Sequence, residues 1–345
     1  MVDLAYAYSN ARVKAMRSKL FDRERIREVM DVRSLPEVIE MLEESPYKKH
    51  FVEASTKYSG VELVKSALDA NLVSTFQKVW EISPAKAKPL LSLLLQQWEV
   101  NNLKKAIAAI GLGKSISLQH LVLVGGWRDA KLLEKIVSQD SLEGVAKALE
   151  FTEYWPSFKK AFAEYRKTRD FRLLLAALDE YYYSLLSKAA ASPGVDEMTK
   201  RFLEHKIGFA AAIAVLRMKH SGVPAEKIRR HLLHNSERFR RLLEKMVSAE
   251  SFEKAAEFLA AESLVGGAAI REKAGRRDLS GVEVELEKAL LSIARKTLSR
   301  SVLSMGALVG YLFLKQEEVH ALRKIAYATQ FDVKQEIRET ILAGW

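Results

Sequence analysis

The chain contains no cysteine, which excludes thiol catalysis, disulfide bonds and every metal site built on thiolates. Its 16 glycines and 7 prolines are few for 345 residues, so collagen-like and low-complexity structures are excluded as well. The longest apolar run without a charge, Val302 to Leu314, has 13 residues. A membrane-spanning helix needs about 20 residues, so we interpret this run as part of a buried helix.

The composition that remains is typical of a globular protein with a sizeable core, at 48% hydrophobic and 29% charged residues. Lysine and arginine number 55 against 44 for aspartate and glutamate, which gives a formal net charge of +11. This excess favours an anionic partner, such as nucleic acid, an acidic protein surface or a membrane headgroup zone. The N-terminal residues lack the pattern of a secretory signal, so we expect a soluble or at most peripheral protein.

Apolar residues recur at steps of three and four, as in Leu174, Leu178 and Tyr181, and alternating strand-like patterns are nearly absent. The sequence therefore predicts an all-α fold. Short helices are expected after Ser34, Ser141 and Ser251, whose hydroxyls suit N-capping, and Glu37 adds a possible capping box to the first.

These short helices recur with a period of about 110 residues, and two kinds of long helix follow the same period. We predict antiparallel long pairs at 56–80 with 84–110, 170–191 with 194–220, and 280–300 with 302–329. The chain then divides into three structural repeats, 1–112, 113–222 and 223–345. The first has an abbreviated short-helix part, and the last ends in a partial copy. Periodicity alone leaves open whether the repeats surround a three-fold axis or form an open row.

No phosphate-binding loop, dinucleotide fingerprint, zinc-protease motif or nucleophile elbow is present in the sequence. His231 and His234 share a helix face but have no evident third ligand, and we interpret them as residues of a helix end. No pair of carboxylates suggests acid–base catalysis. We therefore expect no catalytic, cofactor-binding or metal-binding residues.

The basic excess is concentrated between Glu226 and Lys245, where seven cations accompany three glutamates. Five arginines of this stretch are candidate docking residues for an acidic partner, because guanidinium groups make bidentate contacts with carboxylates: Arg229, Arg230, Arg238, Arg240 and Arg241. A merely solvated helix face is the alternative interpretation.

Four segments together resemble the C subunit of archaeal and bacterial A/V-type rotary ATPases, which is in the same family as the d subunit of eukaryotic V-ATPases. They are YAYSNARVKAMRSKL, QQWEVNNLKKAI, LDEYYYSLL and YLFLKQEEVHALRKIAYA, and the resemblance runs from Tyr6 to Ile341. Their order and spacing carry the resemblance. One departure is the more apolar KIGFAAAIAV around Ile207, where the corresponding helix has WEVNNLKKAI.

The resemblance implies a funnel-like all-α protein with three-fold pseudosymmetry. It also implies a non-catalytic central-stalk subunit that sits on the cytoplasmic face of the membrane, bound to the proteolipid ring. The protein would receive the axle subunits of types D and F and transmit torque for proton or sodium transport. No nucleic acid is expected among its partners. The competing hypothesis from the residues alone is a basic helical-repeat scaffold that binds RNA or an acidic protein.

Overall fold

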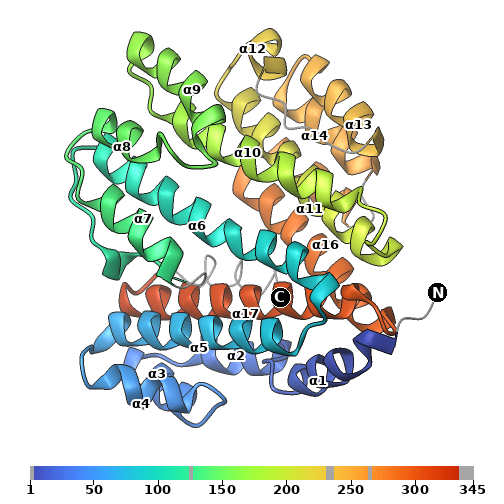
Figure 1. Cartoon of the computed structure of the whole chain (residues 1–345). Coiled ribbons are helices and arrows are strands. Elements are labelled where there is room, and N and C mark those ends of the chain that lie inside the picture. The colour runs from blue at the N-terminus through green and yellow to red at the C-terminus, as the bar shows by residue number, and fades with distance from the viewer. Residues whose placement is uncertain (1–3, 124–126, 231–236, 263–265, 334–345) are drawn as a thin grey trace.

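The computed structural model describes residues 4–123, 127–230, 237–262 and 266–333, and every regular element in these ranges is a helix (Figure 1). The all-α prediction is thus confirmed for this part of the chain. The frame consists of long helices, which follow the predicted pairs to within a few residues at each end. They are α5 (Gly60–Ile82), α6 (Lys88–Gly111), α10 (Arg172–Ala190), α11 (Glu197–His220), α16 (Leu279–Arg300) and α17 (Met305–Gln330).

The long helices pack side by side in a belt whose order is α6, α10, α11, α16, α17 and α5. The second helix of each predicted pair packs against the first helix of another pair: α6 on α10, α11 on α16 and α17 on α5. This shared rule is consistent with a three-fold arrangement of repeats.

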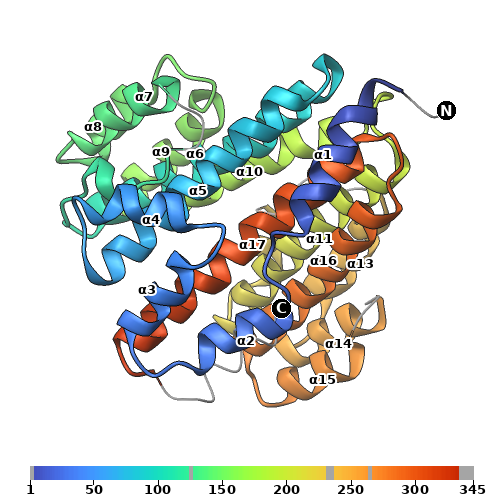
Figure 2. The same ribbon diagram turned by 90° about the horizontal axis from the view of Figure 1, so that it is seen from below.

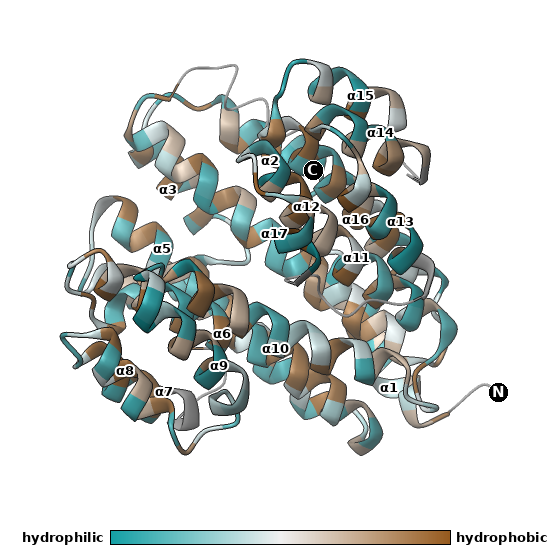
Figure 3. Cartoon of the chain, turned by 90° about the horizontal axis from the view of Figure 1, so that it is seen from above, coloured by the Kyte–Doolittle hydropathy of each residue, from teal (hydrophilic) through white to brown (hydrophobic). Residues whose placement is uncertain are grey.

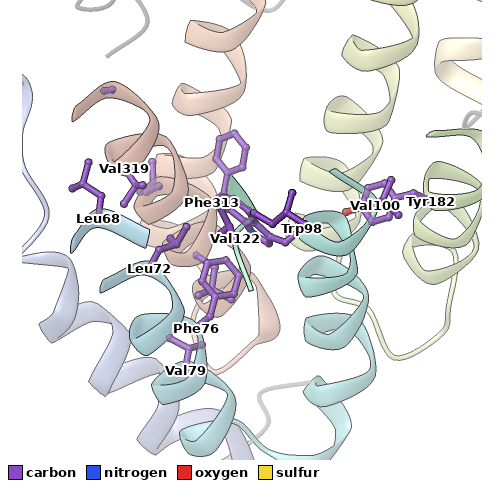
Figure 4. Packing of buried hydrophobic residues seen from close by; sticks show 14 of the residues in the cluster. Leu68, Leu72, Phe76, Val79, Trp98, Val100, Val122, Tyr182, Phe313 and Val319 are labelled. Carbon is purple, nitrogen blue, oxygen red and sulfur yellow. The ribbon is translucent and has the colours of Figure 1, made fainter. Parts of the chain in front are cut away.

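The belt is open at one place, between α5 and α6. These two helices are joined by a turn but fork apart from it (Figure 1), and each packs on a different neighbour. The two helices of the first predicted pair are therefore joined by their turn but do not pack on each other along their lengths. The reason is competition for apolar surface: α5 places Leu68 and Leu72 against α17, where Val319 lies (Figure 4), and α6 packs on α10.

The turns of the three long pairs meet at the end that carries α1 (Ala7–Arg17). The Asn10 amide donates to the Ser304 carbonyl at 3.0 Å and accepts from its N–H at 3.3 Å. The Lys86 ammonium lies 4.8 Å from the centre of the Tyr6 ring. Burial raises the pKa of Tyr6, and the charge of Asp196, in the turn between α10 and α11, adds to the shift. Tyr6 thus lies near two turns, and Asn10 binds the third.

Shorter helices lie outside this frame (Figure 2). They are α2 (Arg23–Asp31), α3 (Leu35–Glu43), α4 (Lys48–Ser55), α7 (Trp127–Val137), α8 (Leu142–Leu149), α9 (Trp155–Thr168), α12 (Ala225–Arg230), α13 (Glu237–Ser248), α14 (Phe252–Glu262) and α15 (Gly267–Gly275). In Figure 3, apolar and polar residues alternate around α8 and α13, as expected for helices that bury one face.

The three predicted N-caps are confirmed. The hydroxyl of Ser34 accepts from the backbone of α3 at 3.5 Å, and those of Ser141 and Ser251 accept from α8 and α14 at 3.1 Å. Glu37 completes the first cap differently from the predicted capping box, because its carboxylate accepts from the Ser34 hydroxyl at 2.6 Å. Only α2 lies between α1 and Ser34, which is consistent with an abbreviated first copy.

Residues 305–314 of the apolar run form the first part of α17 and are buried on every side of the helix, whereas Val302, Leu303 and Ser304 lie in the turn before it. Gly310 allows this close packing: a Cβ there would lie 2.9 Å from both the Ala294 carbonyl oxygen and the Leu298 nitrogen of α16. The interpretation of the run as a buried helix is confirmed. Among the helices that the structure describes, none has both the length and the hydropathy needed to cross a membrane.

Candidate docking surfaces

The described residues contain no group of three or more histidine, aspartate or glutamate side chains placed to hold a metal ion. His231 and His234 lie outside the described residues. The expected absence of catalytic and cofactor-binding residues stays a prediction. Two features are the candidates: the predicted basic surface on α12 and α13, and a small recess between α5 and α6.

Arg229 is the member of the basic surface that α12 contributes, and it is exposed. Its guanidinium donates to the Ser248 hydroxyl at 3.0 Å and lies 3.5 Å from the Glu244 carboxylate. Both partners belong to α13, so part of the role of Arg229 is to join the two helices. An exposed ion pair of this kind contributes little to stability, about 0–1 kcal/mol.

Arg240 and Arg241 lie on the exposed side of α13, whose opposite side buries Phe239, Leu242 and Leu243 in the smaller of two core clusters. Lys245 is exposed one turn further along the helix. The side chains of Arg230 and Arg238 lie outside the described residues. The structure therefore brings Arg229, Arg240 and Arg241 to one pair of short helices. Their docking role is not tested by this placement and stays a prediction.

The recess between α5 and α6 was not predicted from the sequence. It lies where the two helices diverge, and α11 and α17 form its other walls. The lining residues are Phe76, Leu94, Gln97, Phe202, Lys206, Val309, Leu312, Phe313 and Gln316. Figure 4 shows Phe76 of α5 and Phe313 of α17 between the diverging helices. One long polar side chain comes from each of α6, α11 and α17, namely Gln97, Lys206 and Gln316.

Lys206 is the only cationic residue of that lining, and it is 8% exposed. Its ammonium lies 5.0 Å from the centre of the Phe313 ring, a cation–π contact. It forms no hydrogen bond or ion pair with the part of the chain that the structure describes. Burial lowers the pKa of Lys206 to about 8, although the carboxylate of Glu317 acts in the opposite direction. Glu317 itself is paired with His320, 3.5 Å away.

Further from the turn, the two sides of the fork carry more cations. Arg323 of α17 is paired with Asp69 of α5. Lys65 of α5 and Lys105 of α6 also act electrostatically on Asp69. Burial raises the pKa of Asp69 even though all three cations oppose the shift. Three cations thus act on Asp69, and Lys65 is also 3.5 Å from the carboxylate of Glu62, so carboxylates accompany the cations along the fork.

The recess itself is small, with a volume of about 20 Å³, which is room for about one water molecule. The signal that could have revealed it is the segment FLEHKIGF, in which Lys206 stands among Phe202, Ile207 and Phe209 on a helix too apolar to be exposed.

Comparisons with known proteins show the family of this chain. Residues 9–340 match the family model described as ATP synthase (C/AC39) subunit. Among similar proteins, the C subunit of the A-type ATP synthase of Methanocaldococcus jannaschii is 27% identical over 99% of this chain and 88% of that protein. The corresponding proteins of Methanosphaera stadtmanae and Pyrococcus horikoshii are each 27% identical, over 98% and 97% of this chain and 88% and 90% of their own lengths. The resemblance noted in the sequence is confirmed, and the chain belongs to the ATP synthase (C/AC39) subunit family.

Proposed function

We propose that this protein is a non-catalytic central-stalk subunit of an A-type ATP synthase. In this role it is the socket between the axle subunits of types D and F and the proteolipid ring. It transmits torque between the soluble motor and the ring, which transports protons or sodium ions. The relatives are all named as C subunits of A-type ATP synthases, and these names support membership of such an assembly.

The observation that carries the proposal is the belt of long helices, which pack side by side from α6 through α10, α11, α16 and α17 to α5. The helices α6 and α11 have 24 residues each, so each is about 36 Å long. Helices packed side by side at the density of a protein interior resist twisting, because each rotation would force side chains out of their contacts. A rotor adaptor needs this stiffness and two docking surfaces, and it needs no reactive groups.

We assign the end where the three turns meet to the proteolipid ring. Large apolar side chains are exposed there, with Leu4 at 78%, Tyr8 at 63% and Val302 at 64%. Apolar groups at the tip of a rigid body suit contact with a membrane-embedded partner without insertion into the bilayer. The protein would then be peripheral, on the cytoplasmic face of the membrane. The repeats 1–112, 113–222 and 223–345 would surround the rotation axis.

Affinity purification of the tagged full-length chain from detergent-solubilised membranes tests the proposal. We expect axle subunits and proteolipid to elute with the chain in a constant ratio that nuclease treatment does not change. Elution of the chain without either partner would overturn the proposal. Elution with RNA that is lost steeply as salt rises would overturn it in favour of a nucleic-acid scaffold.

A further inference from the structure

The helix α1 has one buried face, which packs on α17 and α5, and one exposed face. The buried face carries Asn10 and Val13. Two large side chains stand on the exposed side, where Leu4, in the turn before α1, is 78% exposed and Tyr8 is 63% exposed. The exposed face continues with three alanines: Ala7, Ala11 and Ala15. The middle of the exposed face is thus largely apolar.

Cations flank this apolar stripe. Successive residues are about 100° apart around a helix, so Arg12 lies about 80° to one side of the stripe and Lys14 about 80° to the other. Arg17 and Lys19 are exposed further along the chain. The structure describes every residue from Leu4 to Phe21, and none of them is an aspartate or glutamate. The exposed face of α1 therefore has four cations and no carboxylate of its own.

The end of α16 and the turn after it extend this surface. The side chain of Asn10 holds that turn against α1 through its two hydrogen bonds with the Ser304 backbone. Val302 in the same turn is 64% exposed. The sequence has no acidic residue between Lys288 and Gln316, and the exposed cations at the end of α16 are Arg295, Lys296 and Arg300. The turn thus repeats the combination found on α1, an exposed apolar side chain beside cations.

Guanidinium groups from three helices come close together beside α1. Burial lowers the pKa of Arg295, and the charges of Arg17 and Arg23 lower it further. Two carboxylates that border this surface act as helix caps: Asp22 accepts from the backbone of α2 at 2.9 Å, and Asp196 accepts from that of α11 at 3.1 Å. A concentration of like charges on an exposed surface favours an anionic partner.

The combination of these features defines the chemistry of the partner. An apolar stripe with basic side chains on both sides is typical of a helix that lies on a membrane surface, with its apolar groups in the headgroup zone. Long basic side chains can then reach the phosphate groups of the lipids. Protein interfaces depend instead on large side chains that fill pockets, and this face consists mainly of alanines and flexible cations. Figure 2 shows α1 on the outside of the long helices, where a flat partner can reach it.

We propose that the exposed face of α1, together with the end of α16 and the turn after it, binds the anionic headgroups of a lipid bilayer. The inference goes beyond the proposed function, because the lipid contact needs no partner subunit. It also gives the basic excess of the chain a role at the end of the molecule opposite to α12 and α13 (Figure 1).

The test measures cosedimentation of the purified full-length chain with lipid vesicles. We expect binding to vesicles that contain phosphatidylglycerol, weakened by salt, and little binding to vesicles of phosphatidylcholine alone. Replacing Arg12, Lys14 and Arg17 together by glutamine should weaken binding by about 100-fold, because each basic side chain near an anionic surface contributes about fivefold. Tyr8→Ser removes the exposed ring and should weaken binding by about tenfold.

The control variant replaces three exposed lysines on and beside α4 by glutamine: Lys48, Lys49 and Lys57. It has the same net charge as the α1 triple variant and should bind within about threefold of the wild type. All substituted residues are exposed, and the unfolding midpoint of each variant checks that it folds.

The proposal is overturned if the wild type does not bind the anionic vesicles, if either α1 variant binds them as the wild type does, or if the α4 variant loses as much affinity as the α1 triple variant. Normal vesicle binding by an α1 triple variant that no longer joins the rotary complex would assign the surface to a protein partner instead. The vesicles contain no protein, so this result and that of the affinity purification are independent.

Discussion

The hydroxyl of Tyr47 donates a 2.5 Å hydrogen bond to the carboxylate of Glu318, which lies 271 residues later in the sequence. The same carboxylate accepts from the Phe21 backbone N–H at 2.5 Å and from the Lys315 ammonium at 2.7 Å. Lys315 also donates to the Tyr47 oxygen at 2.8 Å. All four residues are buried. This network fixes the short helices of the N-terminal part to α17, the most buried helix of the belt.

Replacing Glu318 by glutamine should lower the free energy of unfolding by about 3 kcal/mol, because the change leaves the buried Lys315 ammonium without its counter-charge. Urea-induced unfolding measures the loss. Glu257→Gln is the control, since its pair with Lys254 at 2.7 Å is about half exposed and should contribute less than about 1 kcal/mol. Equal stability of Glu318→Gln and the wild type would show that the network does not hold the helices together.

The free energy of unfolding should depend on pH because the Lys206 side chain binds its proton more weakly in the folded chain than in the unfolded chain. Its folded-state pKa, about 8, is below the unfolded value of 10.5, so the unfolded chain binds more protons between these two values. The stability of the wild type relative to Lys206→Met should therefore be lowest below pH 8. It should rise as the pH increases from 8 to 10.5, by up to about 3 kcal/mol. Chemical unfolding of both proteins across this range measures the difference, and a difference independent of pH would mean that Lys206 is not buried in its charged form.

Gly310→Ala should destabilise the protein by about 2 kcal/mol, because the added Cβ meets backbone atoms of α16 that cannot move independently. Gly194→Ala, in the turn between α10 and α11, should change stability by less than about 1 kcal/mol, since no atom lies within 4 Å of its added Cβ. Thermal unfolding of the two variants compares them directly. Similar losses in both would indicate that α16 and α17 are not in close contact at Gly310.

Reversing the charge at Arg238, Arg240 and Arg241 to glutamate should weaken partner docking if α13 is a docking surface, and circular dichroism should show unchanged helicity. The control triple reverses three exposed lysines of α9: Lys159, Lys160 and Lys167. Assembly of the purified complex, followed by size-exclusion chromatography, is the measurement. If both triple variants assemble as well as the wild type does, α13 is not a docking surface.

The long helices and the serine caps could be predicted because both depend on local patterns, namely apolar periodicity and a hydroxyl before an apolar stretch. The fork between α5 and α6 could not, because the choice of a packing partner depends on the apolar surface that remote helices offer. Leu68 and Leu72 of α5 would suit any apolar helix, and only the fold determines that α17 covers them. Sequence periodicity likewise places Lys206 on a long helix. It does not say which face of that helix packs against the other long helices.

The basic surface illustrates the same limit. A run of arginines predicts an exposed cationic helix, and Arg240 and Arg241 are exposed. The contact of Arg229 with Ser248 and Glu244 depends on how α12 docks on α13, which the sequence does not encode locally.

The central proposal is that this protein couples rotation to ion transport and does not itself catalyse ATP turnover. It is tested most directly in proteoliposomes that contain the rotary ATPase with and without this chain, by measuring ATP hydrolysis and ATP-driven ion uptake together. We predict that omission of the chain abolishes ion uptake while the soluble motor continues to hydrolyse ATP, and that adding the purified chain restores uptake. Ion uptake that continues without the chain would contradict the account.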